Sequence, residues 1–107
     1  MKYSLSSKEI PLVLKNSSVF KTHSFYVRLM LGDSFKVGFG VSRRFGSAVV
    51  RNKFKRQLRA FFKDSGMRNM PFSLLISPRN ITGFSDINSD LNKFYQYMIS
   101  KKEVFNG

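Results

Sequence analysis

A run of basic side chains between Asp33 and Asp64 is the feature of this sequence best suited to bind a ligand. No Asp or Glu lies between those two residues, whereas nine cations do: Lys36, Arg43, Arg44, Arg51, Lys53, Lys55, Arg56, Arg59 and Lys63. An ordinary solvated helix would intersperse Glu and gain stabilising i,i+4 pairs. Because Arg carries a planar fork of donors that matches phosphate oxygens, the run predicts contact with phosphate groups.

The charge of the whole chain points the same way. Nineteen Lys and Arg against six Asp and Glu give a net charge of +13, which a fold does not need and which favours a nucleic acid or an anionic surface as partner. No apolar stretch approaches the roughly 18 residues of a membrane helix, and no signal peptide is recognisable, so we expect a soluble cytoplasmic protein. The absence of cysteine excludes zinc fingers, disulfides and a thiol nucleophile.

A helical period of apolar residues positions these cations. Between residues 47 and 63 the spacing predicts a helix that begins after Ser47, a preferred N-cap, and ends near Gly66. Its buried stripe is expected to be Val50, Phe54, Leu58 and Phe61. Two polar rows lie beside that stripe, the first formed by Arg51, Lys55 and Arg59 and the second by Asn52, Arg56 and Lys63. A merely solvated face and a membrane-surface helix are the alternatives, and the second conflicts with an apolar stripe already needed by the core.

The remaining pattern predicts the elements that pack against this helix. A first helix is expected over residues 8–16, capped by Ser6 or Ser7 and apolar at Ile10, Val13 and Leu14. Alternation predicts a strand over residues 25–31, with Phe25, Val27 and Leu29 on one face and Tyr26, Arg28 and Met30 on the other.

Further strands and a last helix complete the pattern. A second strand over residues 35–41 is expected to form a hairpin with the first, and residues 71–77 read as a buried strand. The last helix is expected over residues 86–101, capped by Ser85, with Ile87, Leu91, Phe94 and Met98 inward. The fold class is therefore α+β, a two-layer α/β sandwich with a mixed sheet of about three to four strands, in one domain over residues 1–107.

Catalytic chemistry is not expected from the protein itself. His23 is the one histidine and has no evident carboxylate partner. Asp86 and Asp90 share a helix face at i,i+4 and have the chemistry to hold Mg²⁺, but such a pair is more typical of a solvated surface. Metal-dependent nucleases need several converging acids, and no Walker-type loop is present. We expect no catalytic residue and no protein metal site.

The run from Val41 to Arg59 resembles the signature of the bacterial ribonuclease P protein family. In that family a strand ending in Val-Ser and two basic residues leads through Gly-Asn-Ala-Val into a helix that contains an Arg-Asn-Arg triplet. This sequence has Ser47 in place of the Asn and Lys53 in place of the second Arg of the triplet. Ser47 retains a side-chain oxygen that can cap the helix. Lys53 keeps the positive charge of Arg but lacks its planar guanidinium, which can donate two hydrogen bonds to one phosphate.

The resemblance implies a function and a topology that composition does not reveal. It implies a left-handed β-α-β crossover, where general rules favour a right-handed one. It implies a non-catalytic protein subunit of an endoribonuclease, whose partners are a catalytic RNA subunit and precursor tRNA, with no membrane and no small-molecule substrate. The Mg²⁺ that supports removal of the tRNA 5′ leader would be held mainly by the RNA. The residues implied to contact that RNA are Arg43, Arg44, Arg51, Asn52, Lys53, Lys55, Arg56 and Arg59. For Asn52, local scaffolding of the helix start is an equal alternative.

A second implied surface is a cleft for the single-stranded leader between the first helix and the sheet. Proteins bind single-stranded nucleic acids by stacking bases on aromatic side chains beside positive charge. Tyr26, Arg28 and Met30 offer that chemistry. The alternative is that these side chains only pack against neighbouring strands. The family commonly places two aromatics four residues apart on the first helix. Here those positions are the aliphatic Ile10 and Leu14.

Three other functions remain to be distinguished. A structural RNA-binding module, such as a small ribosomal protein, would co-sediment with ribosomes. A stand-alone nuclease would cleave RNA without an RNA subunit. A helix-turn-helix DNA binder is disfavoured, because the basic helix lies between strands without a preceding helix and tight turn.

Overall fold

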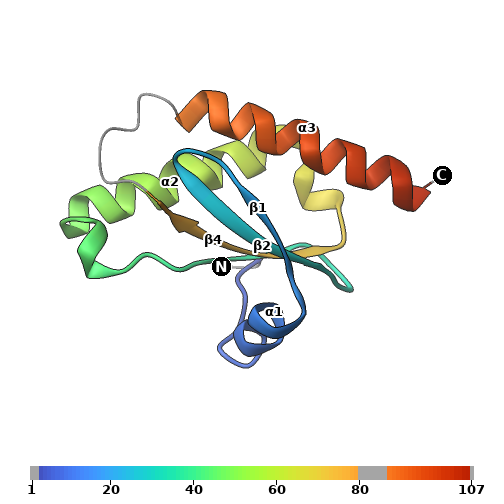
Figure 1. Cartoon of the computed structure of the whole chain (residues 1–107), viewed down its shortest axis with the longest axis horizontal. Helices are drawn as coiled ribbons and strands as arrows, with labels where there is room; N and C mark the ends of the chain where they lie inside the picture. The colour runs from blue at the N-terminus through green and yellow to red at the C-terminus, as the bar shows by residue number, and fades with distance from the viewer. Residues whose placement is uncertain (1–2, 80–86, 107) are drawn as a thin grey trace.

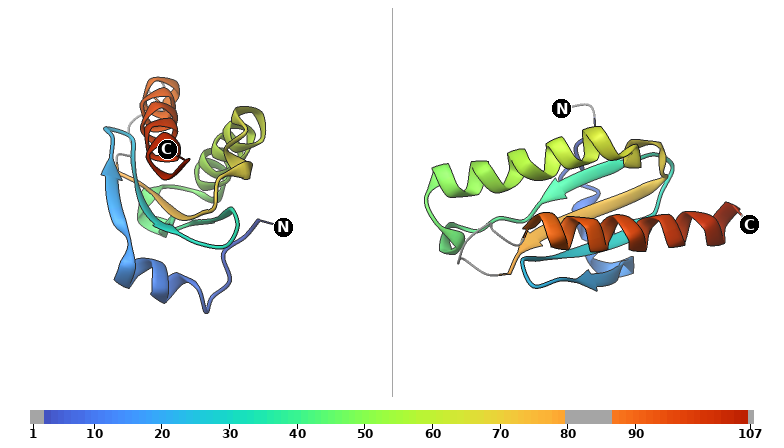
Figure 2. Two further views of the ribbon diagram at one scale, coloured as in Figure 1. Left: turned by 90° about the vertical axis from the view of Figure 1, so that its right-hand side faces the viewer. Right: turned by 90° about the horizontal axis from the view of Figure 1, so that it is seen from above.

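The computed structural model describes residues 3–79 and 87–106 of the chain. Its elements follow in the order α1 (Ile10–Asn16), β1 (Ser18–Lys21), β2 (Phe25–Leu31), β3 (Lys36–Phe39), η1 (Arg43–Phe45), α2 (Ala48–Ser65), η2 (Met67–Asn69), β4 (Phe72–Pro78) and α3 (Ile87–Asn106). Helices α2 and α3 cover one face of the sheet, and the short α1 lies against the other (Figures 1 and 2). The predicted α+β class with a mixed sheet is confirmed.

The four strands lie in the order β1-β2-β4-β3. Strand β2 pairs antiparallel with β1 and β4, while β3 pairs in parallel with β4. The predicted hairpin between β2 and β3 is therefore wrong. Residues 72–76 are buried at every position, so β4 has both faces covered and lies between β2 and β3, as expected for a central strand. The hairpin partner of β2 is instead β1, which the sequence pattern did not predict.

The connection from β3 through α2 to β4 is a left-handed crossover. In the right-hand view of Figure 2, α2 lies in front of the sheet, and when β3 is turned to point upward β4 lies to its left. General rules favour the opposite hand. The crossover places the arginine loop, defined here as residues 41–47, at the carboxyl end of β3 and directly before α2.

One apolar core joins the sheet to α2 and α3. From β2 it receives Phe25, Val27 and Leu29, as predicted, and from α3 it receives Ile87, Leu91, Phe94 and Met98, also as predicted. On α2 the buried residues are Phe54, Leu58 and Phe62. Phe61, which the sequence placed in this stripe, is only partly buried, because its ring turns toward Tyr95 of α3 at a centroid distance of 6.4 Å.

Helix α1 begins differently from the prediction. Its N-cap is Glu9, without a side-chain capping bond, and neither Ser6 nor Ser7 caps it. The backbone N–H of Ser6 donates to the Glu9 carboxylate, and this bond, followed by that from the Lys36 ammonium, lowers the pKa of Glu9 below its ordinary value of 4.5. The Glu9–Lys36 ion pair, at 3.0 Å, ties the start of α1 to β3.

Asp90 is a structural carboxylate, and the expectation of a solvated surface pair is wrong for it. Its side chain is buried and accepts a hydrogen bond of 2.8 Å from the backbone N–H of Ser24, in the β1–β2 turn. Asp86, its expected partner, and Ser85, the expected cap of α3, lie outside the described residues. Within the described ranges, no helix is long and apolar enough to cross a membrane.

The burial pattern of α2 gives a stability prediction. Leu58 is fully buried, whereas Val49 on the same helix is 76% exposed. Leu58→Ala should lower the free energy of unfolding by about 2–5 kcal/mol, because it removes core contacts and leaves a cavity. Val49→Ala should change it by less than about 0.5 kcal/mol. Urea denaturation followed by circular dichroism measures both, and equal effects would contradict the assigned helix face.

Candidate nucleic-acid interface

The arginine loop is held in place by one aromatic anchor. Within it the 3₁₀ turn η1 buries Phe45, whose ring packs edge-to-face on Phe54 of α2 at a centroid distance of 5.6 Å. Arg43 and Arg44, in the same turn, are exposed. The anchor fixes the backbone while the two arginines project into solvent, so the loop presents its charge from a rigid support.

Gly46 makes the turn from this loop into α2. Its φ of +151° is a conformation that L side chains rarely adopt, and an added Cβ would lie 3.2 Å from two side-chain carbons of Val50. The next residue, Ser47, caps α2 as predicted, because its side chain accepts a hydrogen bond from the Val50 N–H at 3.4 Å. Gly66, in the left-handed conformation, ends the helix.

The eight predicted RNA-contact residues lie along the arginine loop and α2. Six of them are exposed, namely Arg43, Arg44, Asn52, Lys53, Arg56 and Arg59, while Arg51 and Lys55 are partly buried. The ion pairs found among the described residues, Lys36–Glu9 and Lys93–Asp90, involve neither the loop nor this helix. The side chain of Asn52 makes no hydrogen bond within the described part of the chain, which gives no support to the scaffolding alternative.

Two arginines of the first row, Arg51 and Arg59, pack against the protein without forming an ion pair to a described acidic residue. The Arg59 guanidinium lies 5.4 Å from the ring centroid of Phe39 on β3 and stays exposed. Stacking of this kind orients the guanidinium plane and leaves its N–H groups available to an anion. The Nε of Arg51 is buried and has no hydrogen-bond partner among the described residues. The row therefore runs beside the edge strand β3, and no carboxylate in the described part of the chain forms an ion pair with it.

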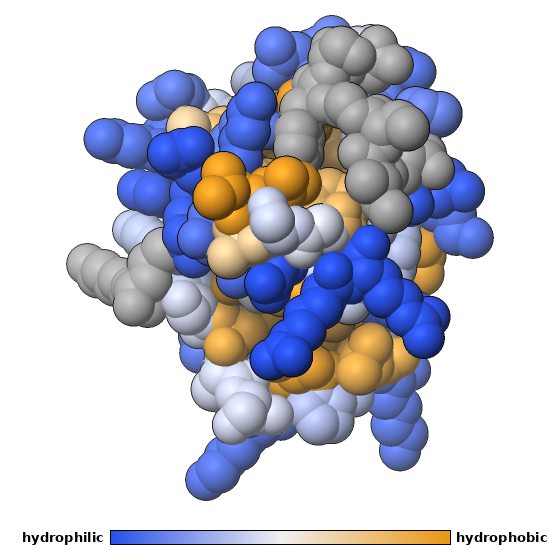
Figure 3. Space-filling model, turned by 90° about the vertical axis from the view of Figure 1, so that its left-hand side faces the viewer, coloured by the Kyte–Doolittle hydropathy of each residue, from blue (hydrophilic) through white to orange (hydrophobic). Residues whose placement is uncertain are grey.

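A cavity of about 320 Å³ adjoins the arginine loop at the carboxyl ends of β3 and β4. Its walls include Arg44 and Phe45 from the loop, Tyr26 from β2, and Ser77 and Arg79 from the end of β4. Figure 3 shows the end of the molecule that carries the loop, where hydrophilic side chains lie across and around exposed apolar ones. Positive charge and an aromatic ring thus line one hollow, which suits a single-stranded segment.

Arg79 is the residue of this cavity that sequence reasoning missed. It follows the buried strand β4 directly, and its guanidinium donates to the Thr22 carbonyl at 2.8 Å. Because β3 and β4 are parallel, their carboxyl ends meet at one edge of the sheet, which brings Arg79 beside Arg44. The sequence feature that could have identified Arg79 is that a basic residue follows each of two parallel strands. This feature predicts a shared site only when the pairing of those strands is known.

The five predicted cleft residues are divided between β2 and α1. On β2, Tyr26, Arg28 and Met30 are partly buried and lie on the face opposite the α2–α3 layer. The Arg28 guanidinium is 5.8 Å from the Tyr26 ring centroid. On α1, Ile10 is partly buried, whereas Leu14 is exposed. Of the apolar face expected for that helix, only Val13 is buried, because the helix has fewer than two and a half turns against the sheet.

Two glycines, Gly38 in β3 and Gly40 just after it, let other parts of the chain approach closely. A Cβ on Gly38 would lie 3.1 Å from the side chain of Leu5, and one on Gly40 would lie 2.7 Å from the Ser77 hydroxyl. The N-terminal segment therefore packs over β3, and the protein itself occupies the space beside Gly38. Among the side chains that the structure describes, in residues 3–79 and 87–101, no three His, Asp or Glu lie together as metal ligands would.

The comparison with known families identifies the family of this chain. The family model described as Ribonuclease P matches residues 4–99, nearly the whole chain. This chain belongs to the ribonuclease P protein family. The match includes the arginine loop, α2 and the strands on either side, so the resemblance seen in the sequence motif is confirmed.

Curated relatives with the same description are found in several bacteria. The ribonuclease P protein component of Mycoplasmopsis synoviae is 34% identical over 68 residues, which are 64% of this chain and 61% of the relative. That of Citrifermentans bemidjiense is 41% identical over 54 residues, 47% of each protein. The aligned part of the chain thus spans about half to three fifths of the length of these curated relatives.

Solved structures support the fold of the ribonuclease P protein family. The ribonuclease P protein of Staphylococcus aureus superposes with a TM-score of 0.66 at 26% identity, covering 72% of this chain and 74% of that one. The protein from Thermotoga maritima gives a TM-score of 0.68 at 24% identity, with coverage of 91% and 92%. The second match, at its lower identity, is evidence for the fold alone.

The geometry at Gly46 predicts a local cost of substitution. Gly46→Ala should lower the free energy of unfolding by about 1–3 kcal/mol through backbone strain, with a further loss from contact with Val50. Gly66→Ala is the matched control, because it also has a positive φ but nothing within 4 Å of the added Cβ. Denaturation should show the larger loss for Gly46→Ala, and Val50→Ala in the same chain should restore part of it. No rescue by Val50→Ala, which removes Cγ1 and retains Cβ, would mean that the contact with Cγ1 is not the cause.

Proposed function

We propose that this chain is the protein subunit of a ribonuclease P ribonucleoprotein. In this role it binds a catalytic RNA and the 5′ leader of precursor tRNA, and it assists the Mg²⁺-dependent cut that leaves the mature tRNA 5′ end. The observation that carries the proposal is the surface of the arginine loop and α2. It is cationic, its arginines have no carboxylate partner among the described residues, and it belongs to a chain of this family.

The proposed contact with the catalytic RNA follows from electrostatics. Exposed arginines on one rigid surface repel each other in the free protein, and phosphates of a folded RNA remove that repulsion and release counterions. Arg43 and Arg44 would contact phosphates from the loop, and Arg56 and Arg59 from the helix. The guanidinium of Arg59, which lies over the Phe39 ring and is exposed, would be available for a two-bond contact with a phosphate.

The leader is proposed to enter through the cavity beside the arginine loop. Tyr26 offers a ring for base stacking, and Arg44 and Arg79 lie on the walls near it to meet backbone phosphates. From there the strand would continue over Arg28 and Met30 on the open face of β2, toward α1. This route uses aromatic stacking on the sheet, and it does not require aromatics at Ile10 or Leu14.

Chemistry is assigned to the RNA partner. We propose that the catalytic Mg²⁺ is held by the RNA. In keeping with this proposal, the described residues contain no cluster of three acids or histidines that could hold a metal ion. The protein's part is to neutralise phosphates, stabilise the active RNA fold and hold the leader. Such work would take place in the cytoplasm, where precursor tRNA is matured.

Reconstitution tests the proposed function. Added to ribonuclease P RNA of the same source at low Mg²⁺, the chain should stimulate cleavage of precursor tRNA at the leader junction. Arg59→Ala should reduce the stimulation by about threefold to tenfold, because a charge-assisted contact contributes roughly 1 kcal/mol or more. Lys101→Ala, at the far end of α3, is the matched charge control and should retain it. Absence of stimulation by the unaltered chain would reject the proposal.

The leader route makes a separate prediction. Tyr26→Leu should weaken binding of precursor tRNA to the reconstituted enzyme by about tenfold, because stacking of a base on an aromatic ring is worth roughly 1–3 kcal/mol. Tyr26→Phe retains the ring and should bind as well as the unaltered chain. Mature tRNA, which has no leader, should bind all three proteins equally. An equal loss for Tyr26→Phe, or for mature tRNA, would place the effect elsewhere.

A further inference from the structure

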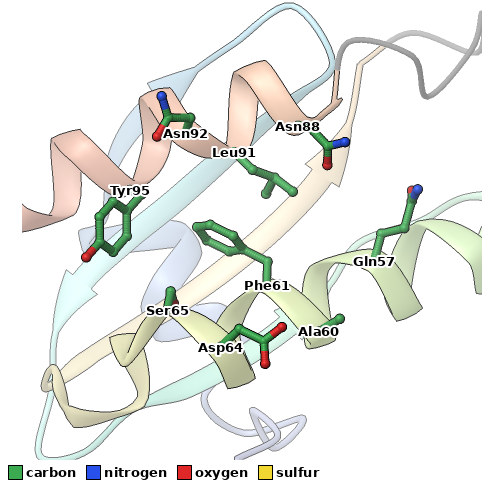
Figure 4. A pocket seen from close by; sticks show the side chains of 9 residues that line it. All are labelled: Gln57, Ala60, Phe61, Asp64, Ser65, Asn88, Leu91, Asn92 and Tyr95. Atoms are coloured by element: carbon green, nitrogen blue, oxygen red, sulfur yellow. The ribbon is translucent and has the colours of Figure 1, made fainter.

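A groove between α2 and α3 is not used by the function proposed above. It has a volume of about 610 Å³, within the range of pockets that bind small ligands. Figure 4 shows that its side chains come from the facing sides of the two helices. Phe61 reaches across from α2 toward Leu91 and Tyr95 of α3, and these three form an apolar floor.

The charge of this groove is opposite to that of the rest of the protein. None of the residues that line it is Lys or Arg, in a chain that has nineteen. Its one charged side chain is the carboxylate of Asp64, on the α2 side. The other polar groups that line it are uncharged amides and hydroxyls, among them the amide of Asn92. A phosphate would therefore not lie inside the groove, whereas a ligand that donates hydrogen bonds to a carboxylate would.

A second polar group of the groove lacks a partner. Gln57 lines the end away from Tyr95, and its Oε1 is buried without a hydrogen bond among the described residues. A buried acceptor without a donor is unfavourable, and a ligand N–H or O–H would relieve it. Gln57 precedes Asp64 by seven residues, which is roughly 10 Å along a helix. That separation is about the length of a nucleoside.

We propose that this groove binds the guanine base of a nucleotide. The Watson–Crick edge of guanine carries two adjacent donors, N1–H and the N2 amino group, which match the two oxygens of the Asp64 carboxylate. The base would stack against the aromatic floor, as bases of single-stranded RNA do on aromatic side chains. A ribose hydroxyl would then donate to Gln57 Oε1, and the phosphate would leave the groove near the exposed Arg56, the residue that precedes Gln57 in α2.

The same geometry discriminates against the other bases. Adenine presents one donor and the N1 acceptor, which would face the carboxylate unfavourably. Uracil has a single N–H between two acceptors, and cytosine has an amino donor beside an acceptor. A matched pair of hydrogen bonds to one base typically discriminates by tenfold or more. Selectivity for guanine is thus the signature that separates this site from general attraction of nucleotides by a protein of +13 charge.

Titration of the isolated full-length chain with guanosine monophosphate tests the site. Amide and aromatic NMR signals of α2 and α3 should shift on binding, and adenosine monophosphate should bind about tenfold more weakly. Asp64→Asn should abolish this preference, because the amide offers only one acceptor. Asp33→Asn, which removes an acid from an exposed turn, is the matched control and should retain it. The isolated chain is used, so this test is independent of the ribonuclease P activity proposed above.

Equal affinity for the two nucleotides, or an undiminished preference in Asp64→Asn, would overturn the proposal. Signal shifts confined to the arginine loop would overturn it as well, since they would report charge attraction alone. Two short single-stranded RNAs, one with a central G and one with a central A in a uridine background, identify the source of the base. Much tighter G-selective binding of the RNA than of the mononucleotide assigns the site to an RNA base, and similar affinities assign it to a free nucleotide.

Discussion

Packing of the apolar seam of α2 against the sheet and α3 is the interaction on which the rest of this structure depends. Phe54, Leu58 and Phe62 are almost completely buried, and burial of three such side chains contributes several kcal/mol in total. That stabilisation offsets the mutual repulsion of the cations on the other sides of the helix, whose arginines form no ion pair with a carboxylate among the described residues. The seam therefore permits α2 to stay folded while it displays a surface complementary to phosphates.

The order of the strands gives that charged surface its shape. Since β4 lies between β2 and β3, the carboxyl ends of two parallel strands meet beside the first turn of α2. The arginine loop leaves one strand and Arg79 follows the other, so both enclose the same hollow with Tyr26. An antiparallel hairpin of β2 and β3 would have separated these groups. The RNA surface and the proposed leader route are adjacent because of this topology.

Local chemistry made much of the fold predictable, and non-local pairing did not. The bounds of α2 followed from Ser47 and Gly66, whose capping roles depend on near neighbours only. The partner of β3 could not be predicted in this way, because alternation within a strand does not identify its neighbour. The burial of Asp90 was missed for a similar reason, since its donor, Ser24, lies 66 residues away. The hand of the crossover came from the family resemblance and opposes the general rule. The RNA contacts themselves stay predictions.

The salt dependence of RNA binding measures the central electrostatic claim most directly. For the reconstituted complex, the logarithm of the binding constant should fall linearly with the logarithm of the salt concentration. Each phosphate contact should contribute about 0.7–0.9 to the slope. Arg56→Ala together with Arg59→Ala should therefore lower the slope by roughly 1.4–1.8, while the fold stays intact. An unchanged slope, with the protein still folded, would show that these arginines do not lie against phosphates and would contradict the account.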